Sequence, residues 1–130
     1  MGKREVIDPG SGGAGRYTFS PGVVKEGRLL FISGLTATDD QGNIVGKGDI
    51  VTQARVIFTK IGEILETAGA TFDDVVKTVD YITTTENYRG TADVRREFFR
   101  TDFPAATGVI VAGLLRPDAL IEIEAVAVID

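Results

Sequence analysis

The segment 119–129, ALIEIEAVAVI, constrains the fold more than any other part of the chain. Side chains in a strand alternate between the two faces of a sheet. One face here receives only apolar side chains, namely Ile121, Ile123, Ala125 and Ala127, and we expect it to contact helices. The other face receives Glu122, Glu124, Val126 and Val128. The segment therefore predicts a long strand with a buried face and a face that carries two carboxylates.

The rest of the chain alternates between strand and helix patterns. The stretches RYTF (16–19) and VVKEGRLLFISG (23–34) predict short strands joined near 25–27, as in a hairpin. Apolar residues recur every three or four positions over 50–70, which predicts a helix that Asp49 caps and Gly69 ends. A β-branched strand follows at 75–84, then a shorter helix at 86–100 and strands at 106–115 and 119–129.

This order, β-β-α-β-α-β-β, predicts a two-layer α/β domain with a mixed sheet of five or six strands and two helices on one face. The other face needs a partner, most simply another copy of the chain. We expect one domain over 1–130 whose first fifteen residues are flexible or rich in turns. The pattern Gly-x-Gly-x-x-Gly at 10–15 lacks the strand and helix of a dinucleotide site, so we reject that interpretation.

Composition removes several kinds of chemistry. The chain has no Cys and no His, which excludes disulfides, thiol nucleophiles, His bases and nearly all zinc sites. Its formal charge of −5 argues against broad nucleic-acid binding. The apolar runs are too short to span a membrane, and no leader pattern opens the chain, so we expect a cytoplasmic protein. In the loop 36–49, Asp39, Asp40 and Asn43 are better explained by a turn than by a cation site.

The two glutamates of segment 119–129 allow two interpretations. At two-residue spacing they lie roughly 7 Å apart on the sheet face that the helices leave uncovered. Most such carboxylates are solvated rim charges or partners of an arginine. Alternatively, one of them holds or activates a water molecule in a cleft between subunits.

Several motifs make the chain similar to a known family. They are GRY at 15–17, ISG at 32–34, AGATFDDVVKTVDYI at 68–82, REFF, FPA and the closing IEIEAVAV. Together they resemble the Rid family, of the RidA/YjgF type of enamine/imine deaminase, over about 16–130. The resemblance implies a chorismate-mutase-like fold and a homotrimer with clefts between subunits. It also implies hydrolysis of small enamines or imines without a cofactor or metal.

The resemblance assigns a site residue by residue. Tyr17 matches a cleft tyrosine, Ser33 and Gly34 match a strand-end Ser-Gly pair, and Glu122 matches the glutamate that positions the attacking water. Three matches to the family's site fail. Ala106 replaces the arginine that holds a substrate carboxylate, Ala92 replaces an asparagine, and Gly108 replaces a cysteine. We still place these three positions in the substrate site. The chain therefore resembles an arginine-lacking branch.

The loss of that arginine changes the expected substrate. A 2-imino acid needs its carboxylate held, and Ala106 offers no donor. A neutral or differently shaped substrate then becomes the better expectation, with Thr107 and the backbone near Gly108 as remaining donors. Arg95 or Arg96 could reach the site from the second helix, but we expect both on a solvated helix face.

The sequence leaves three functions open. The first is a hydrolase in which Glu122 activates water while Tyr17 and Ser33 bind the reacting group. The second is a non-catalytic trimer that binds a small ligand or a protein partner. The third is an endoribonuclease using Arg89, Arg96 and Arg100, against which the acidity of the chain and the lack of interleaved aromatic residues argue.

Overall fold

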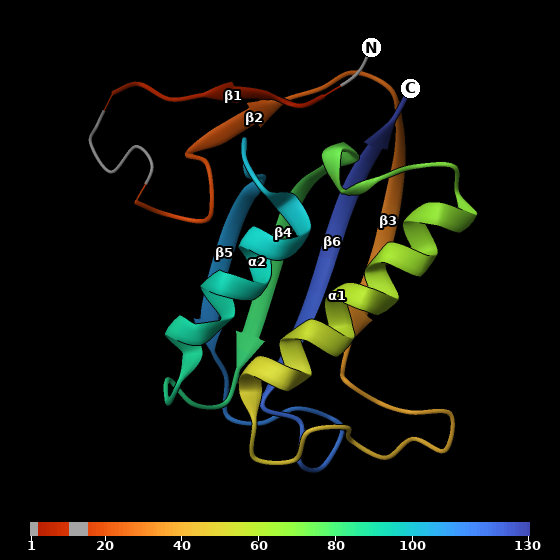
Figure 1. Cartoon of the computed structure of the whole chain (residues 1–130), viewed down its shortest axis with the longest axis vertical. Helices are drawn as coiled ribbons and strands as arrows, with labels where there is room; N and C mark the ends of the chain where they lie inside the picture. The colour runs from red at the N-terminus through yellow and green to blue at the C-terminus, as the bar shows by residue number, and fades with distance from the viewer. Residues whose placement is uncertain (1–2, 11–15) are drawn as a thin grey trace.

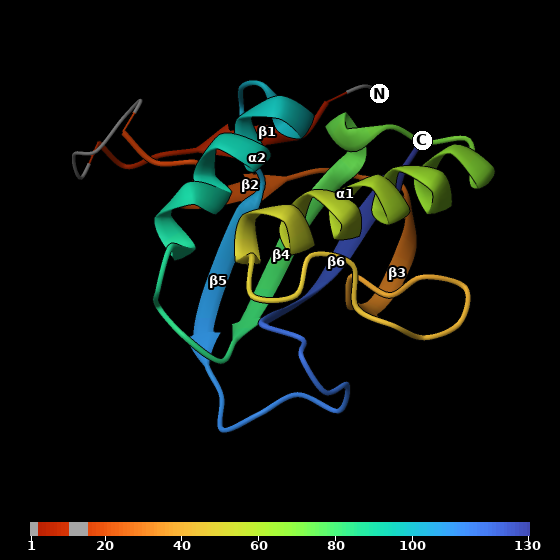
Figure 2. The ribbon, with the colours of Figure 1, turned by 60° about the horizontal axis from the view of Figure 1, so that its bottom comes forward.

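The computed structural model describes residues 3–10 and 16–130. Its centre is a four-stranded mixed sheet in the order β3 (Arg28–Leu35), β6 (Ile121–Ile129), β4 (Val75–Ile82) and β5 (Ala105–Ile110) (Figure 1). Strand β6 runs antiparallel to both neighbours, and β4 and β5 are parallel. Helices α1 (Ile50–Thr67) and α2 (Thr91–Phe99) lie on the same side of the sheet (Figure 2). The predicted two-layer α/β class is confirmed.

The six strands do not form one sheet, however. Strands β1 (Glu5–Ile7) and β2 (Gly22–Val24) pair with each other as a separate two-stranded sheet. The predicted hairpin near 25–27 is wrong, because β2 pairs with β1 and β3 pairs with β6. Residues 16–19 form no strand. At Gly27, φ is +147°, and an added Cβ would lie 2.2 Å from the carbonyl oxygen of Ile129, so the chain crosses closely over the end of β6.

Within the N-terminal segment, β1 is a short strand that the sequence analysis did not predict. The guanidinium of Arg4 is buried and donates to the carbonyl oxygens of Phe72 at 2.8 Å and Val75 at 3.2 Å, and also to that of Asp102. These bonds hold β1 against the main domain. Residues 11–15, and with them most of the rejected glycine motif, lie outside the described residues.

Both helices form close to where the sequence predicts them. Asp49 caps α1 by accepting from the backbone N–H of Thr52 at 3.1 Å, and Gly69 follows the helix with a φ of +78°. The second helix is shorter than predicted, because a 3-10 turn, η2 (Tyr88–Gly90), precedes it. Another, η1 (Phe72–Asp74), leads into β4. Strand β5 ends at Ile110, five residues before the predicted end.

The hydrophobic core lies between the helices and the sheet. It includes Ile57, Phe58, Ile61 and Leu65 of α1, and Ile121, Ile123, Ala125 and Ala127 of β6, so the predicted inward face of β6 is confirmed. The rings of Phe58, Phe72, Phe98 and Phe99 form one cluster at the end of this layer.

The opposite sheet face is uncovered and carries exposed apolar side chains on β3. Leu29 and Phe31 of β3 expose 61% and 71% of their surface, next to the half-buried Val126 of β6. Val128, predicted on this face, is only 4% exposed, and the chain at Gly27 packs against it. Within the described ranges, no helix has the length and apolarity that a membrane span requires.

Candidate functional site

A β-bulge brings three of the predicted site residues together. The pairing of β3 with β6 shifts register between Ile32 and Leu35, so Ser33 and Gly34 bulge out of the ladder. The Glu122 carboxylate lies directly against Gly34, because a Cβ at position 34 would be 2.1 Å from Glu122 Oε2. Ser33 is exposed beside it. We call Ser33, Gly34 and Glu122 the bulge group.

The two glutamates of β6 have different surroundings. Glu124 accepts a short hydrogen bond from the Tyr81 hydroxyl, and this bond raises the pKa of Tyr81. Among the described residues, no hydrogen bond or ion pair holds the Glu122 carboxylate. Glu122 is therefore the glutamate that is available to a ligand or a water molecule.

A second group of predicted residues lines a cavity of about 370 Å³ between α2 and the strands β4 and β5, which we call the α2–β5 pocket. Four predicted positions, Ala92, Ala106, Thr107 and Gly108, border this pocket. Its other lining residues are Thr18, Phe19, Asp80, Tyr88, Thr91 and Arg95. Tyr17, which is exposed, stacks on Phe19 with ring centroids 5.0 Å apart and so lies near the pocket.

Arg95 is part of this pocket, and its predicted place on a solvated face is wrong. Its side chain is 5% exposed, donates from Nε to the carbonyl oxygen of Thr18 at 2.9 Å, and donates from Nη1 to Thr78 Oγ1 at 3.1 Å. Burial lowers the pKa of Arg95, and the nearby Asp80 carboxylate opposes that shift. Arg96 is exposed as predicted and pairs with Asp93 at 2.8 Å.

Asp80, on β4, places a carboxylate near the Arg95 guanidinium. It is 5% exposed, and its Oδ2 accepts a 2.8 Å hydrogen bond from the Tyr88 hydroxyl. Burial raises the pKa of Asp80, whereas Arg95 and the bond from Tyr88 favour its ionised form. Burial and Asp80 together raise the pKa of Tyr88.

The missing side chain at position 108 makes the bond between Tyr88 and Asp80 possible. An added Cβ at Gly108 would lie 2.7 Å from the Tyr88 hydroxyl oxygen. A cysteine there, as in the resembled family, would push this hydroxyl away. Thr107 is held from the opposite side of the sheet, where its Oγ1 accepts from Lys77 Nζ at 2.8 Å.

Sequence reasoning missed Asp80, Tyr88, Thr18 and Phe19. Asp80 carried a detectable signal, because it alternates with Thr78 and Ile82 on the buried face of β4. Arg95 carried one as well, since it lies midway between the buried Thr91 and Phe99 at four-residue steps along α2.

The structure does not join the two groups within one chain. The bulge group lies on β3 and β6, and the α2–β5 pocket lies beside β5. Strands β3 and β5 form the two opposite edges of the sheet (Figure 1). Glu122 also faces the uncovered side, whereas Asp80 lies on the face that packs against the helices. A site that uses both groups would therefore need two copies of the chain.

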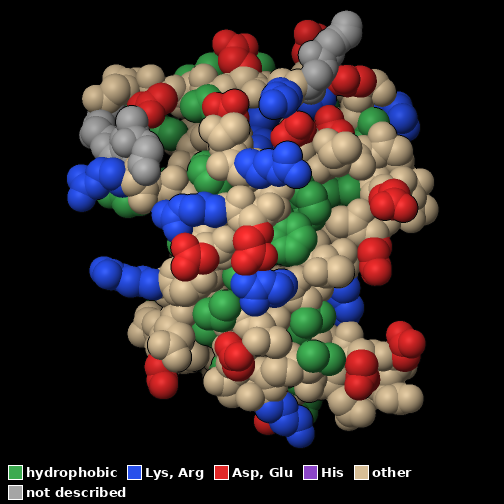
Figure 3. Space-filling model, viewed as in Figure 1, with side chains coloured by type: hydrophobic (Ala, Val, Ile, Leu, Met, Phe, Trp, Pro, Cys, Tyr) green, Lys and Arg blue, Asp and Glu red, His purple; other side chains and the backbone are tan. Residues whose placement is uncertain are grey.

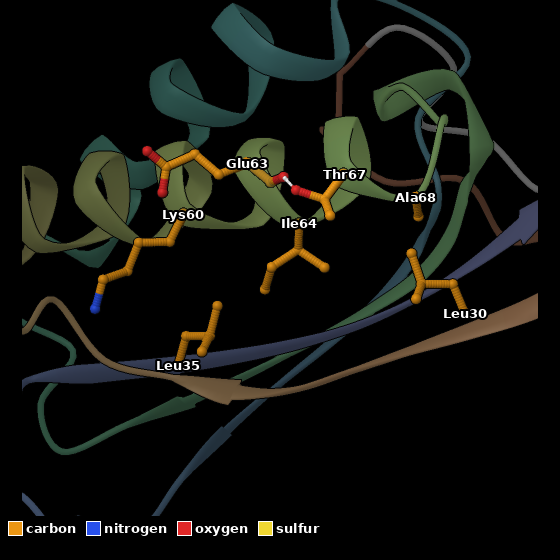
Figure 4. Close-up of a pocket in the computed structure, with 7 residues that line it drawn as sticks. All are labelled: Leu30, Leu35, Lys60, Glu63, Ile64, Thr67 and Ala68. Atoms are coloured by element: carbon orange, nitrogen blue, oxygen red, sulfur yellow. Dashed lines mark hydrogen bonds between the residues drawn. The ribbon is translucent and has the colours of Figure 1, made fainter.

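A larger hollow, of about 540 Å³, lies between α1 and β3 (Figure 4). Leu35 and Ile64 face each other across it, and Leu30 and Ala68 line its far end. Lys60 donates to the Thr36 carbonyl oxygen and to Thr38 Oγ1, at 3.0 and 2.9 Å. This hollow is open and mostly apolar, and it lacks the convergent polar groups of a catalytic site.

Other charged side chains, outside these two groups, form ion pairs or turn contacts within the fold. Positive and negative side chains are interspersed on the face that bears the helices (Figure 3). There Glu97 pairs with Arg55 at 2.7 Å, and Asp93 pairs with Arg96. Asp39 Oδ1 accepts from the backbone N–H groups of Gln41 and Asn43 at 2.9 Å, which confirms the predicted turn. The part of the chain that is described contains no cluster of carboxylates suited to a metal ion.

Comparison with known proteins supports this architecture. The family model described as Endoribonuclease L-PSP matches residues 14–129. The Rid-family protein YyfB from Yersinia pestis is 33% identical over 98% of this chain and 99% of its own, with a TM-score of 0.86. This chain belongs to the Rid/YjgF family.

Two further structures extend the comparison. A Mycobacterium tuberculosis member of the YjgF/YER057c/UK114 family is 32% identical over 97% of this chain and 99% of its own, with a TM-score of 0.68. The Escherichia coli protein TdcF, solved with bound serine, is 28% identical over 98% of this chain and 94% of its own, with a TM-score of 0.71.

Proposed function

We propose that this Rid-family protein is a hydrolase that acts on an enamine, imine or related C–N bond of a small metabolite. The observation that carries the proposal is the Glu122 carboxylate, which lies over Gly34, has no partner among the residues that the structure describes, and lies beside the hydroxyl-bearing Ser33. A carboxylate in this setting can orient water and accept its proton. The serine bound to the relative TdcF supports a site of small-molecule size.

The chemistry needs no histidine. An enamine first takes a proton from solvent on carbon and gives up an N–H proton to solvent, which makes it an imine. Glu122 accepts a proton from water as the water oxygen bonds to the imine carbon, and the C=N electron pair moves to nitrogen, which takes a proton from solvent. Glu122 then passes its proton to the amine nitrogen of this carbinolamine, and the C–N bond breaks as the hydroxyl loses its proton to solvent, which gives a carbonyl product and ammonia. Ser33 and Tyr17 would hydrogen-bond the reacting group.

We further propose that this site forms between two copies in a homotrimer. The bulge group and the α2–β5 pocket lie at opposite edges of one sheet. In a closed ring with the uncovered faces inward, the β3 edge of one copy lies beside the β5 edge of the next. The exposed Leu29 and Phe31 would then be buried at the centre. A cytoplasmic location remains an expectation from the sequence.

Standard 2-imino acids are expected to be poor substrates. Ala106 offers no donor to a substrate carboxylate, and Arg95 has its Nε and Nη1 already bound. Loss of a desolvated carboxylate clamp costs about 2–5 kcal/mol. Turnover of 2-iminobutyrate or 2-iminopropionate should therefore be roughly thirty-fold to several thousand-fold below that of an arginine-bearing relative. Equal turnover would contradict this specificity.

The test of the hydrolase is a panel of short-lived enamines and imines offered to wild type, Glu122→Gln and Glu124→Gln. Glu122→Gln should keep the fold and assembly and lose about 10²-fold or more of turnover. Glu124→Gln should act mainly on stability, because Glu124 is held by Tyr81. Full activity of Glu122→Gln would contradict water activation by this carboxylate. Absence of all turnover would favour a non-catalytic binding protein.

The name of the family model makes RNA cleavage the second candidate. Arg96 of α2 and Arg100, which directly follows the helix, are exposed, although Arg96 is paired with Asp93. Cleavage that survives stringent purification and falls when both arginines are neutralised would favour an endoribonuclease.

A further inference from the structure

Two side chains that line the α2–β5 pocket each carry a polar atom without a partner in the described part of the chain. Asp80 Oδ1 and Arg95 Nη2 are buried and have no hydrogen-bond partner among the described residues. Both side chains are 5% exposed, and both line the same cavity. Buried polar atoms without partners are costly and rare in folded proteins. A group that both accepts from Arg95 and donates to Asp80 would satisfy the two atoms together.

The two side chains are fixed in advance. Arg95 is anchored through Nε to Thr18 and through Nη1 to Thr78, and its guanidinium lies 5.2 Å from the ring centroid of Phe99. Asp80 is anchored through Oδ2 to Tyr88. A ligand in the pocket would therefore find both side chains already ordered, with one nitrogen of Arg95 and one oxygen of Asp80 still unpartnered in the described part of the chain, which favours binding.

The charges in the pocket decide which ligands fit. In its ionised form, which Arg95 and the bond from Tyr88 favour, Asp80 balances the charge of Arg95, so the pair attracts neither anions nor cations as strongly as a lone charge would. A carboxylate can accept from Arg95 but cannot donate to Asp80, which repels it. An ammonium group can donate to Asp80 but cannot accept from Arg95. A primary amide or a ureido group presents a carbonyl oxygen and an N–H side by side and matches both atoms.

The small residues around the pocket leave room for such a group. Ala92, Ala106 and Gly108 border the cavity, and its volume of about 370 Å³ lies within the range of small-molecule sites. A longer side chain at position 106, which points to the same sheet face as Asp80, would enter this space.

We propose that the α2–β5 pocket binds an uncharged amide or ureido group, with its carbonyl oxygen on Arg95 Nη2 and its N–H on Asp80 Oδ1. The inference rests on the proposed function only where it makes the amide or ureido group a part of the hydrolysed substrate. Binding itself requires no turnover.

The test compares ligands of matched size by ligand-observed NMR and by titration of the purified protein. The probes are propionamide and N-methylurea against propionate. Wild type should bind propionamide and N-methylurea, and propionate at least about tenfold more weakly, because the unmatched Asp80 oxygen penalises it. Asp80→Asn leaves a net positive pocket, so propionate should gain and the preference should fall or reverse. Arg96→Ala, which changes an exposed arginine on the same helix, should behave as wild type.

A second variant keeps the test decisive if Asp80→Asn does not fold. Ala106→Phe fills the pocket without removing a hydrogen bond and should abolish binding of propionamide. Equal or tighter binding of propionate to wild type, or undiminished propionamide binding to Ala106→Phe, would overturn the inference. The proposed hydrolase activity is tested separately. Amide binding without turnover on the enamine panel would contradict the hydrolase proposal and would not contradict this inference.

Discussion

At the residue scale, the position of the Glu122 carboxylate depends on the absence of a side chain at Gly34. Gly34 gives the carboxylate a place to lie against the backbone of the neighbouring strand, where its Oε2 would be 2.1 Å from an added Cβ. Ser33 is exposed beside it because the bulge takes both residues out of the β-ladder. A glycine is therefore required here for the space that it leaves to the Glu122 carboxylate and not for a special backbone dihedral angle.

Gly34→Ala tests this dependence. The new Cβ displaces the end of a flexible side chain, so we expect little change in melting temperature, whereas the moved Glu122 should lower turnover by about tenfold or more. The matched control is Gly113→Ala, where an added Cβ meets nothing within 4 Å. Thermal melts and enamine turnover measure the two effects. Unchanged turnover in Gly34→Ala would show that the observed carboxylate position is unimportant.

The sequence predicted some site residues and not others for identifiable reasons. Glu122 was visible as a charge inside a strongly alternating strand, and a family motif pointed to Ser33 and Gly34. The burial of Arg95 could not be predicted with equal ease, because the acceptors of its hydrogen bonds, Thr18 and Thr78, lie on other segments of the chain. The bond between Tyr88 and Asp80 in turn depends on the absence of a side chain at Gly108.

At the element scale, local signals predicted the helices well and the N-terminal strands poorly. Helix α1 has an N-cap at Asp49 and a glycine at its end, and both act within a few residues of the helix. The pairing of β1 with β2 instead depends on contacts distant in sequence, such as those of Arg4 with Phe72 and Val75. Such pairings leave no periodic trace in the sequence.

Lys25 joins the end of β6 to the turn before β4, and this link should depend on pH. Its Nζ lies 2.8 Å from Asp130 and 3.4 Å from Asp74, and its side chain is 3% exposed. Burial lowers the pKa of Lys25, but the bonds to Asp130 and Asp74 outweigh burial and raise it overall. The bond from Lys25 lowers the pKa of Asp130 from 3.8.

The sign of the effect follows from these two shifts. The depressed pKa of Asp130 gives stability that is present above pH 3.8 and is lost as the pH falls through the folded-state pKa. The raised pKa of Lys25 gives stability that is full below pH 10.5 and is lost as the pH rises through its folded-state pKa. Lys25→Met should therefore lower the melting temperature at pH 7, and the difference from wild type should shrink in acid.

Melting curves from pH 2 to pH 8 would measure this difference. Lys3→Met is the matched control, because Lys3 is exposed and lies 4.0 Å from Asp73. Its melting temperature should stay close to that of wild type throughout. A deficit in Lys25→Met that persists unchanged in acid would mean that the methionine disturbs packing and that the ion pair contributes little.

At the scale of the whole molecule, the uncovered sheet face predicts assembly. Leu29 and Phe31 are far more exposed than apolar side chains of this size usually are. Light scattering should give about three times 13.9 kDa for wild type. Phe31→Asp should shift the mass towards that of a single chain, whereas Leu115→Asp, at an exposed loop position, should leave it unchanged. A wild-type monomer at micromolar concentration would contradict both the trimer and the intersubunit site.

The central claim is that a bulge group from one copy and an α2–β5 pocket from another form one hydrolytic site. Mixed assemblies test it most directly: Glu122→Gln and Ala106→Phe chains are unfolded together in equal amounts, refolded, and assayed on the substrate found in the enamine panel. Each variant alone should be nearly inactive. In the mixture, about one quarter of the sites should combine an intact glutamate with an intact pocket and recover that share of wild-type turnover. Turnover no higher than the sum of the two parents would contradict a site shared between copies.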